Sequence, residues 1–143
     1  MTAVEFHFNA PDKFAYAVRL LGKAVRKGAH VVVTADADRL HELDRMLWTF
    51  EPTAFLPHCI ADDAAQAVVD VSPVVLAESA RTVAHHDVLL NLGESVPEGF
   101  ERFERLIEVV TLDEPDRVVA RRRWRHYADR GYALKRVDLL LKG

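Results

Sequence analysis

The segment His30–Thr34 (HVVVT) decides the fold class of this chain. A run of β-branched apolar residues is typical of a strand that is covered on both faces, as in a parallel sheet. Residues 4–8 (VEFHF) alternate between apolar and polar side chains, which predicts an earlier strand. Between the two strands, residues 14–25 carry apolar side chains at helical spacing, and Gly28 follows as a stop. Asp36 is placed to cap a second helix, so the order β-α-β-α predicts an α/β fold.

The second half of the chain continues this pattern. Residues 73–77 (PVVLA), 88–92 (VLLNL) and 106–112 (LIEVVTL) predict three more strands. Asp113 then opens a long helix with a proline in its first turn, and Gly131 is placed to end it. We therefore expect a three-layer α/β/α fold with a mostly parallel central sheet.

Three segments are less regular. Glu51–Ala61 contains two prolines and predicts no simple helix. A short helix is expected around Phe100–Arg105, and the state of Leu134–Leu140 stays open.

Size and composition predict one globular domain over residues 1–143. The chain is 50% hydrophobic and 29% charged, which is an ordinary mixture for such a domain. Its one cysteine, Cys59, excludes an internal disulfide and a CxxC site. The sequence shows neither a run of about 20 apolar residues nor a secretory signal, so we expect a cytoplasmic protein without membrane contact.

Charge is distributed unevenly along the chain. Residues 117–136 hold eight of the 19 basic residues and one of the 22 acidic ones, so this window carries +7 and the remainder −10. One interpretation is a binding site for an anionic partner, and the other is a solvated basic helix face.

Motifs for nucleotides are missing from the sequence. No two of the six glycines have the spacing of a GxGxxG or Walker A loop. The fold therefore resembles a nucleotide-binding scaffold without a phosphate loop, and we expect no cofactor.

Candidate catalytic and metal-binding residues are weak. His85 and His86 are adjacent, but no further ligand spacing accompanies them. Asp36 and Asp38 follow a strand and are better explained by helix capping. Cys59 has the character of a buried or half-buried thiol. We therefore expect no catalytic residues and no metal site.

One stripe of the long helix combines arginine with tryptophan. Arg117, Arg121, Trp124 and Arg125 follow one another at positions i, i+4, i+7 and i+8. Such a stripe suits an acidic peptide with an apolar anchor, or single-stranded nucleic acid. The alternative is that Trp124 belongs to the core and the arginines border it.

A second cluster of large apolar residues surrounds the irregular segment. Trp48, Phe55, Leu56 and Pro57 either form a protein-docking patch or close the edge of the core under a loop.

Four stretches together resemble the chi subunit of bacterial DNA polymerase III holoenzyme: Leu47–His58 (LWTFEPTAFLPH), Asp87–Leu92 (DVLLNL), Glu108–Val110 (EVV) and Ala120–Leu134 (ARRRWRHYADRGYAL). The resemblance covers nearly the whole chain. It implies a non-enzymatic adaptor in DNA replication that holds the acidic C-terminal tail of single-stranded-DNA-binding protein. The resemblance further implies that in some bacteria the adaptor docks the psi subunit on the clamp loader. It also implies that contact with DNA is indirect.

The resemblance also implies two sets of site residues. The tail-binding residues are Val110, Arg117, Arg121, Trp124, Arg125 and Arg136. The psi-docking residues are Trp48, Phe55, Pro57 and His58. Arg117 stands where the family usually has lysine, and Trp124 where it usually has tyrosine. The resemblance implies a tail that ends in an apolar residue with a free carboxylate. Arg117, Arg125 and Lys135 are expected to attract the acidic residues upstream of it. A direct single-stranded nucleic-acid-binding domain remains the alternative.

Overall fold

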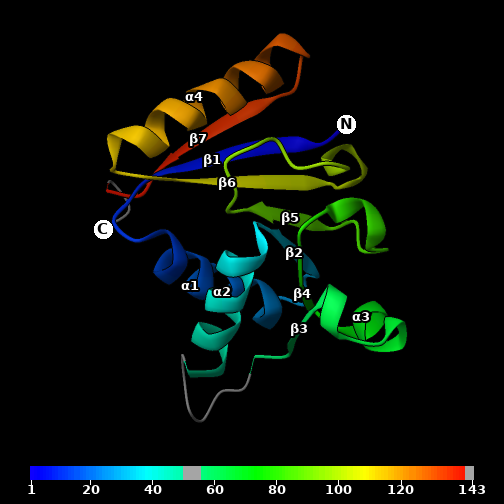
Figure 1. Ribbon diagram of the computed structural model, residues 1–143. Coiled ribbons are helices and arrows are strands. Elements are labelled where there is room, and N and C mark those ends of the chain that lie inside the picture. Colours follow the sequence, from blue (N-terminus) through cyan, green and yellow to red (C-terminus); the bar gives the residue numbers. More distant parts are fainter. Residues whose placement is uncertain (50–55, 141–143) are drawn as a thin grey trace.

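The computed structural model describes residues 1–49 and 56–140. Its elements are β1 (Ala3–Ala10), α1 (Lys13–Arg26), β2 (Val31–Thr34), α2 (Ala37–Thr49), β3 (His58–Ile60), η1 (Ala61–Asp63), α3 (Gln66–Val71), β4 (Val74–Ala77), η2 (Ala80–Thr82), β5 (Val88–Asn91), η3 (Phe100–Arg102), β6 (Arg105–Thr111), α4 (Glu114–Asp129) and β7 (Leu134–Asp138). Figure 1 labels the main ones.

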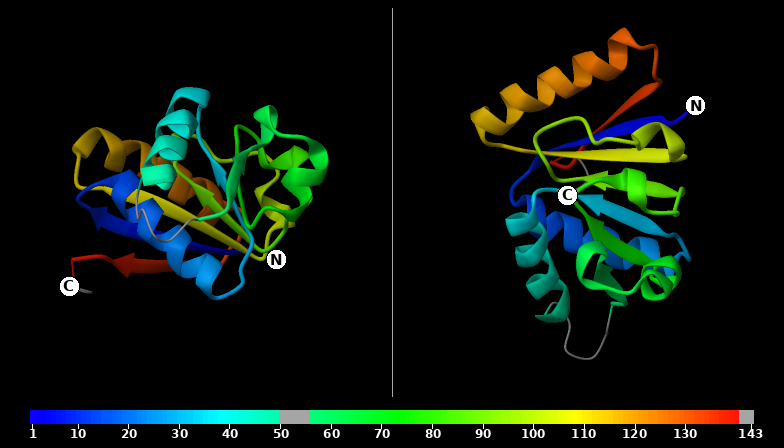
Figure 2. Two further views of the ribbon diagram at one scale, coloured as in Figure 1. Left: turned by 90° about the horizontal axis from the view of Figure 1, so that it is seen from below. Right: turned by 45° about the vertical axis from the view of Figure 1, so that its right-hand side comes forward.

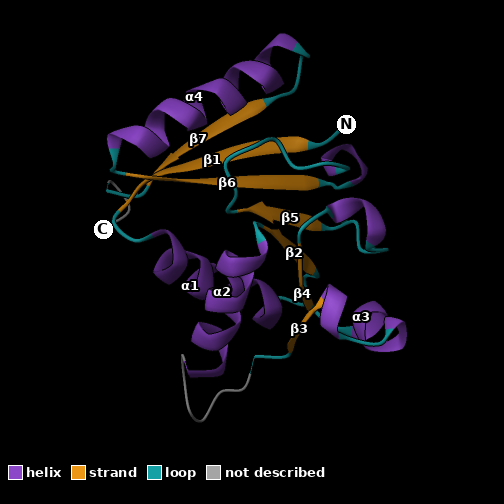
Figure 3. Ribbon diagram, in the orientation of Figure 1, coloured by secondary structure: helices purple, strands orange, loops and turns teal. Residues whose placement is uncertain are grey.

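All seven strands belong to one sheet, in the order β3-β4-β2-β5-β6-β1-β7. Every pair of neighbouring strands is parallel, so the predicted mostly parallel sheet is wholly parallel (Figure 3). β2 lies inside the sheet, where Val31 is in register with Val74 on one side and Val88 on the other. All four residues of β2 are buried, as the HVVVT segment predicts.

Helices cover both faces of the sheet, which gives the three layers (Figure 2). Val31 and Val33 of β2 pack with α1 and α2, whereas Val32 packs in a second cluster with residues of α3 and α4. The split follows from the strand itself, because successive side chains point to opposite faces. The groove described below lies on the α4 face.

The two edge strands were not predicted from the sequence. β7 comes from the segment whose state stayed open, and β3 forms inside Glu51–Ala61, which was expected to be irregular. Both strands pair on only one side, and β7 is partly exposed, so neither carries a fully apolar pattern. The helix expected over 100–105 is also shorter: η3 ends at Arg102 and β6 already begins at Arg105.

Helix ends agree with the sequence signals. The Asp36 Oδ1 atom accepts a hydrogen bond from the Arg39 amide at 2.9 Å, which caps α2. Gly131 follows α4 with a φ of 79°, a left-handed conformation that glycine adopts without steric cost. None of the described helices has the length and apolar character needed to cross a membrane.

Candidate partner-binding groove

Helix α4 and strands β1, β6 and β7 border an open hollow of about 320 Å³. We call it the α4 groove. It is lined by Phe6, Phe8, Val110, Arg117, Ala120, Arg121, Trp124 and Arg136. The structure therefore brings together five of the six residues assigned to tail binding, although they come from three different elements.

The floor of the α4 groove is apolar. Val110 on β6 and Ala120 on α4 are buried, and Phe6 on β1 lies beneath them in the same cluster. Trp124 is half-buried, and its ring meets Phe6 edge to face with 5.1 Å between ring centroids. Trp124 thus satisfies both interpretations of the sequence, because one side packs on the core and another lines the groove. Nothing in the sequence pattern indicated Phe6 or Phe8 as groove residues.

The rim of the α4 groove is basic. Arg136 of β7 lies over the Phe8 ring at 5.0 Å from its centroid, a cation–π arrangement. Arg121 forms an ion pair with Glu114 at 3.2 Å, and both side chains are more than half exposed. Arg117 forms no ion pair within residues 1–49 and 56–140. The groove therefore offers positive charge on two sides of an apolar floor.

Two basic residues expected at this site lie elsewhere. Arg125 is exposed on α4 and does not line the groove. Lys135 precedes Arg136 on β7 and so points to the opposite face of the sheet, where it lines a different cavity with Glu5. Lys135 therefore does not line the α4 groove, and its long-range attraction of the tail stays a prediction.

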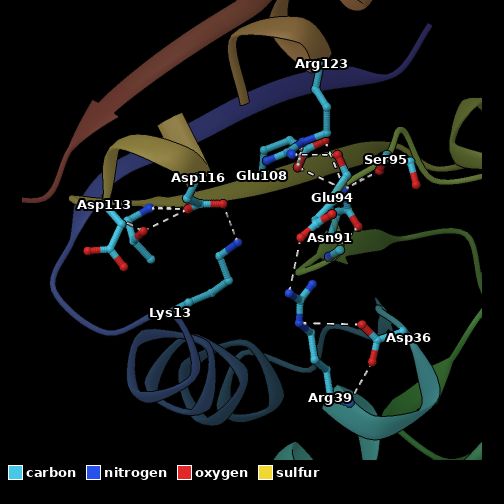
Figure 4. A network of polar contacts seen from close by, with 12 residues as sticks. Lys13, Asp36, Arg39, Asn91, Glu94, Ser95, Glu108, Asp113, Asp116 and Arg123 are labelled. Carbon is cyan, nitrogen blue, oxygen red and sulfur yellow. Dashed lines mark hydrogen bonds and ion pairs between the residues drawn. The ribbon is translucent and has the colours of Figure 1, made fainter. Parts of the chain in front are cut away.

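A buried polar network holds α4 against β6 (Figure 4). Arg123 Nε donates to Glu108 Oε1 at 3.0 Å, and both residues are almost fully buried. The Tyr127 hydroxyl donates to Glu108 Oε2 at 2.6 Å, and Asn91 Nδ2 donates to Oε1 at 3.0 Å. Burial raises the pKa of Glu108, although the Arg123 guanidinium and these donors act in the opposite direction.

This network was missed in the sequence. Arg123 counts toward the basic window, yet the structure neutralises it with Glu108 in the core. Arg123 Nη1 also donates to the Glu94 carbonyl at 2.9 Å, so α4 is tied to the loop after β5. The sequence held one signal for this network, which is the acidic residue Glu108 within the apolar segment LIEVVTL. A carboxylate that is buried in a strand needs a cationic partner.

A second polar contact secures the first turn of α4. Asp116 accepts hydrogen bonds from the Thr111 amide at 2.8 Å and the Thr111 hydroxyl at 2.9 Å. Lys13 of α1 donates to the same carboxylate at 3.1 Å. Burial raises the pKa of Asp116, but these hydrogen bonds and the Lys13 charge outweigh it, so the pKa lies below its usual value.

The residues assigned to psi docking are partly assembled. Trp48 is 57% exposed and meets the His58 ring edge to face at 5.0 Å. The His58 ring nitrogens contact Asp44 Oδ1 at 2.8 Å and the Leu56 carbonyl at 2.7 Å, so His58 positions Trp48 and is itself covered. Pro57 is exposed beside them, and we call Trp48 and Pro57 the Trp48 patch. Phe55 lies outside the described residues.

Other candidate residues have structural environments. His85 is buried and its Nε2 contacts the Ser72 carbonyl at 2.7 Å. Cys59 is a half-buried thiol on β3. Among residues 1–49 and 56–140, no group of three or more His, Cys, Asp or Glu side chains is arranged to hold a metal ion.

Comparison with known proteins identifies the family. Residues 1–135 match the sequence model of the family described as DNA polymerase III chi subunit, HolC. This chain belongs to the chi subunit family. Chi is a non-catalytic accessory subunit of DNA polymerase III, so the chain takes part in DNA replication and is not an enzyme.

Individual chi subunits align along most of the chain. The DNA polymerase III subunit chi of Pseudomonas aeruginosa is 34% identical over 140 residues, which cover 94% of this chain and 95% of the relative. The corresponding subunit of Haemophilus influenzae is 26% identical over 82% of this chain and 81% of its own length. That of Escherichia coli is 25% identical over 76% of this chain and 74% of its own length.

Proposed function

We propose that this chi subunit binds the acidic C-terminal tail of single-stranded-DNA-binding protein in the α4 groove and links it to the clamp loader. The observation that carries the proposal is the basic rim around an apolar floor. A chain end that combines an apolar side chain, a free carboxylate and upstream acidic residues has the complementary chemistry. As a replisome subunit, the protein would act in the cytoplasm.

The tail would enter with its last side chain between Val110 and Trp124. Its terminal carboxylate would then lie within reach of Arg121, whose guanidinium accommodates a carboxylate through two parallel hydrogen bonds. Arg117 and Arg136 border the same groove and would face the acidic residues upstream. Arg125, outside the groove, would contribute only long-range attraction.

A titration with a labelled tail peptide tests this proposal. The peptide carries the C-terminal residues of the organism's own single-stranded-DNA-binding protein, and a matched peptide lacks the final residue. We expect micromolar binding by the complete peptide, because the groove is small, and weaker binding at higher salt. Equal binding of both peptides, or no effect of salt, would contradict the proposal.

Single-stranded DNA is the other candidate ligand for the basic helix. Sequence-independent DNA binders present several stacking aromatic rings along a basic track. Here the groove has Phe6 and Phe8 in its apolar lining beside Trp124, and among the residues that the structure describes no row of stacking rings along a basic track lines it, which favours a single apolar side chain as ligand. Competition between an oligonucleotide and the tail peptide separates the two ligands. Displacement of the peptide by short single-stranded DNA at equal concentration would favour the DNA alternative.

We further propose that the Trp48 patch contacts the clamp loader, through psi where that subunit is present. Large exposed aromatic residues beside proline are typical anchors of protein interfaces. The contact between Trp48 and His58 supports this role, because it orients the indole ring before any partner arrives.

A further inference from the structure

We propose a second binding site in this protein: a cavity beneath α1 that takes a small organic anion, with an apolar body and a carboxylate or phosphate group. The cavity has a volume of about 290 Å³ and lies between α1 and the sheet. We call it the α1 cavity. It opens on the sheet face opposite α4, as the opposite orientations of Lys135 and Arg136 show, so it is separate from the α4 groove.

The floor of the α1 cavity is a connected polar chain. The Glu5 carboxylate accepts from Arg105 Nε at 2.8 Å and Nη2 at 3.1 Å. His7 Nε2 lies 3.1 Å from Glu5 Oε1, and His7 Nδ1 lies 2.5 Å from the Tyr16 hydroxyl. His7 therefore bridges the Glu5 carboxylate of its own strand and the Tyr16 hydroxyl of α1.

The pKa values of Glu5 and Tyr16 are shifted in opposite directions in this chain of contacts. Burial acts to raise the pKa of Glu5, but hydrogen bonds from Arg105 and His7 lower it below its usual value. Burial and the Glu5 charge raise the pKa of Tyr16, so its hydroxyl stays protonated. Within this chain of contacts, the charge of the Glu5 carboxylate is paired with that of the Arg105 guanidinium.

The rim of the α1 cavity adds charge that the floor does not balance. Lys23, Lys27 and Lys135 line it and are exposed. None of the three forms an ion pair with the residues described by the structure. Glu5 is the one acidic side chain in the lining, and Arg105 already neutralises it. The uncompensated rim therefore selects an anion.

Apolar side chains form the walls between floor and rim. Leu20 and Ala24 of α1 face Val88 and Ile107 of the sheet across the cavity. An apolar wall excludes a bare hydrated ion as the preferred ligand, because such an ion would lose water without gaining contacts. The combination selects a small molecule with an apolar body that lies inside and an anionic group at the lysines.

Titration of the full-length protein followed by ¹H–¹⁵N NMR tests the site. The probes are phenyl phosphate and benzoate, which share an aromatic body and differ in the anionic group. Benzyl alcohol is the neutral counterpart, and inorganic phosphate is the anion without the body. We expect saturable shifts for Ala24, Lys27, Arg105 and Lys135 with one or both aromatic anions, and weaker shifts with the other two probes. The stronger aromatic anion identifies the preferred head group.

Two variants supply the decisive comparison. Lys27→Met removes a rim charge, whereas Arg26→Met removes an equal charge from the adjacent exposed residue, which does not line the cavity. We expect Lys27→Met to weaken binding about threefold and Arg26→Met to leave it unchanged. Equal effects of the two variants, or binding of benzyl alcohol as strong as that of the stronger aromatic anion, would overturn the proposal. Absence of saturable shifts with both aromatic anions would overturn it as well.

Discussion

At the scale of single residues, three consecutive arginines have three different environments. Arg121 lines the α4 groove, Arg122 is exposed to solvent and Arg123 is 2% exposed against Glu108. Helix geometry explains the difference, because each step along α4 turns the side chain by about 100°. The same residue type therefore lines a groove, faces solvent and pairs in the core within three positions.

Substitution of each arginine separates these roles. We expect Arg121→Ala to weaken tail-peptide binding about 10- to 100-fold, because a charge-assisted hydrogen bond is lost. Arg122→Ala is the matched control and should change affinity little. Arg123→Met should lower the free energy of unfolding by about 3–5 kcal/mol, because Glu108 loses its buried partner.

Peptide titration and urea unfolding measure these two effects. For Arg122→Ala we expect a change in unfolding free energy of no more than about 0.5 kcal/mol. If Arg122→Ala weakened the peptide as strongly as Arg121→Ala, the basic helix would attract the tail by total charge and not through the groove.

At the scale of elements, α4 depends on polar contacts at both ends of its contact with β6. Arg123 and Tyr127 secure its middle and last turns on Glu108, and Asp116 secures its first turn on Thr111 and Lys13. Because α4 and β6 supply most of the groove, these contacts determine the distance between Val110 and the arginine rim.

The Asp116 contact should give a measurable pH dependence. Its pKa is lowered in the folded state, so its contribution to stability is complete above the usual pKa of an aspartate, about 4, and is lost as pH falls through the lowered value. We expect Asp116→Asn to lower the unfolding free energy by about 1–2 kcal/mol at pH 7. The difference from the unmodified protein should shrink below pH ~4.

Urea unfolding at pH 7 and near pH 3 provides this measurement. Asp113→Asn is the control, because Asp113 begins the same helix without a side-chain capping hydrogen bond. A deficit in Asp116→Asn that stays constant at both pH values would assign the effect to packing.

Glu114 is a competitor for the proposed ligand. It occupies Arg121 in the free protein at 3.2 Å, and a tail carboxylate would have to replace it. We expect Glu114→Gln to strengthen tail binding by about two- to fivefold, the range for an exposed ion pair. Asp113→Asn removes the same charge one position earlier and should have a smaller effect on the affinity, which peptide titration determines.

At the scale of the whole molecule, the two proposed protein-binding surfaces are far apart in the sheet. α4 packs at the β6, β1 and β7 side, whereas the carboxyl end of α2, which carries Trp48, lies toward β3 (Figure 1). A rigid parallel sheet separates them. The proposed adaptor role would use this separation, because both partners would have to bind at once.

We predict that the α4 groove and the Trp48 patch bind their partners independently. We expect Trp48→Ala to abolish co-purification with clamp-loader subunits and to leave tail-peptide affinity unchanged, while Arg121→Ala does the reverse. Sites without shared contacts show additive effects, so the double variant should lose both activities by the sum of the single changes. A loss of tail affinity in Trp48→Ala would show instead that the two surfaces are coupled through the sheet.

Much of the core and the helix ends follow from local sequence. HVVVT, PVVLA and VLLNL predicted buried strands because an apolar run without periodicity belongs to a sheet covered on both faces. Asp36 and Gly131 predicted helix ends, because a capping hydrogen bond and a left-handed residue each depend on a few neighbouring positions in the sequence. The missing glycine loop argued against nucleotide binding. The four family stretches indicated the chi family, and the match over residues 1–135 assigned the chain to it.

Tertiary structure alone decided which segments form the edge strands of the sheet and which charged residues are neutralised. β7 exists because Leu134–Asp138 pairs with β1, whose residues lie about 130 positions earlier in the chain, and no local pattern records that pairing. The same pairing sends Arg136 into the α4 groove and Lys135 into the α1 cavity. Arg123 could be separated from Arg121 and Arg122 only by the placement of α4 over Glu108. Charge counts along a sequence are local, whereas neutralisation depends on which residues the fold brings into contact.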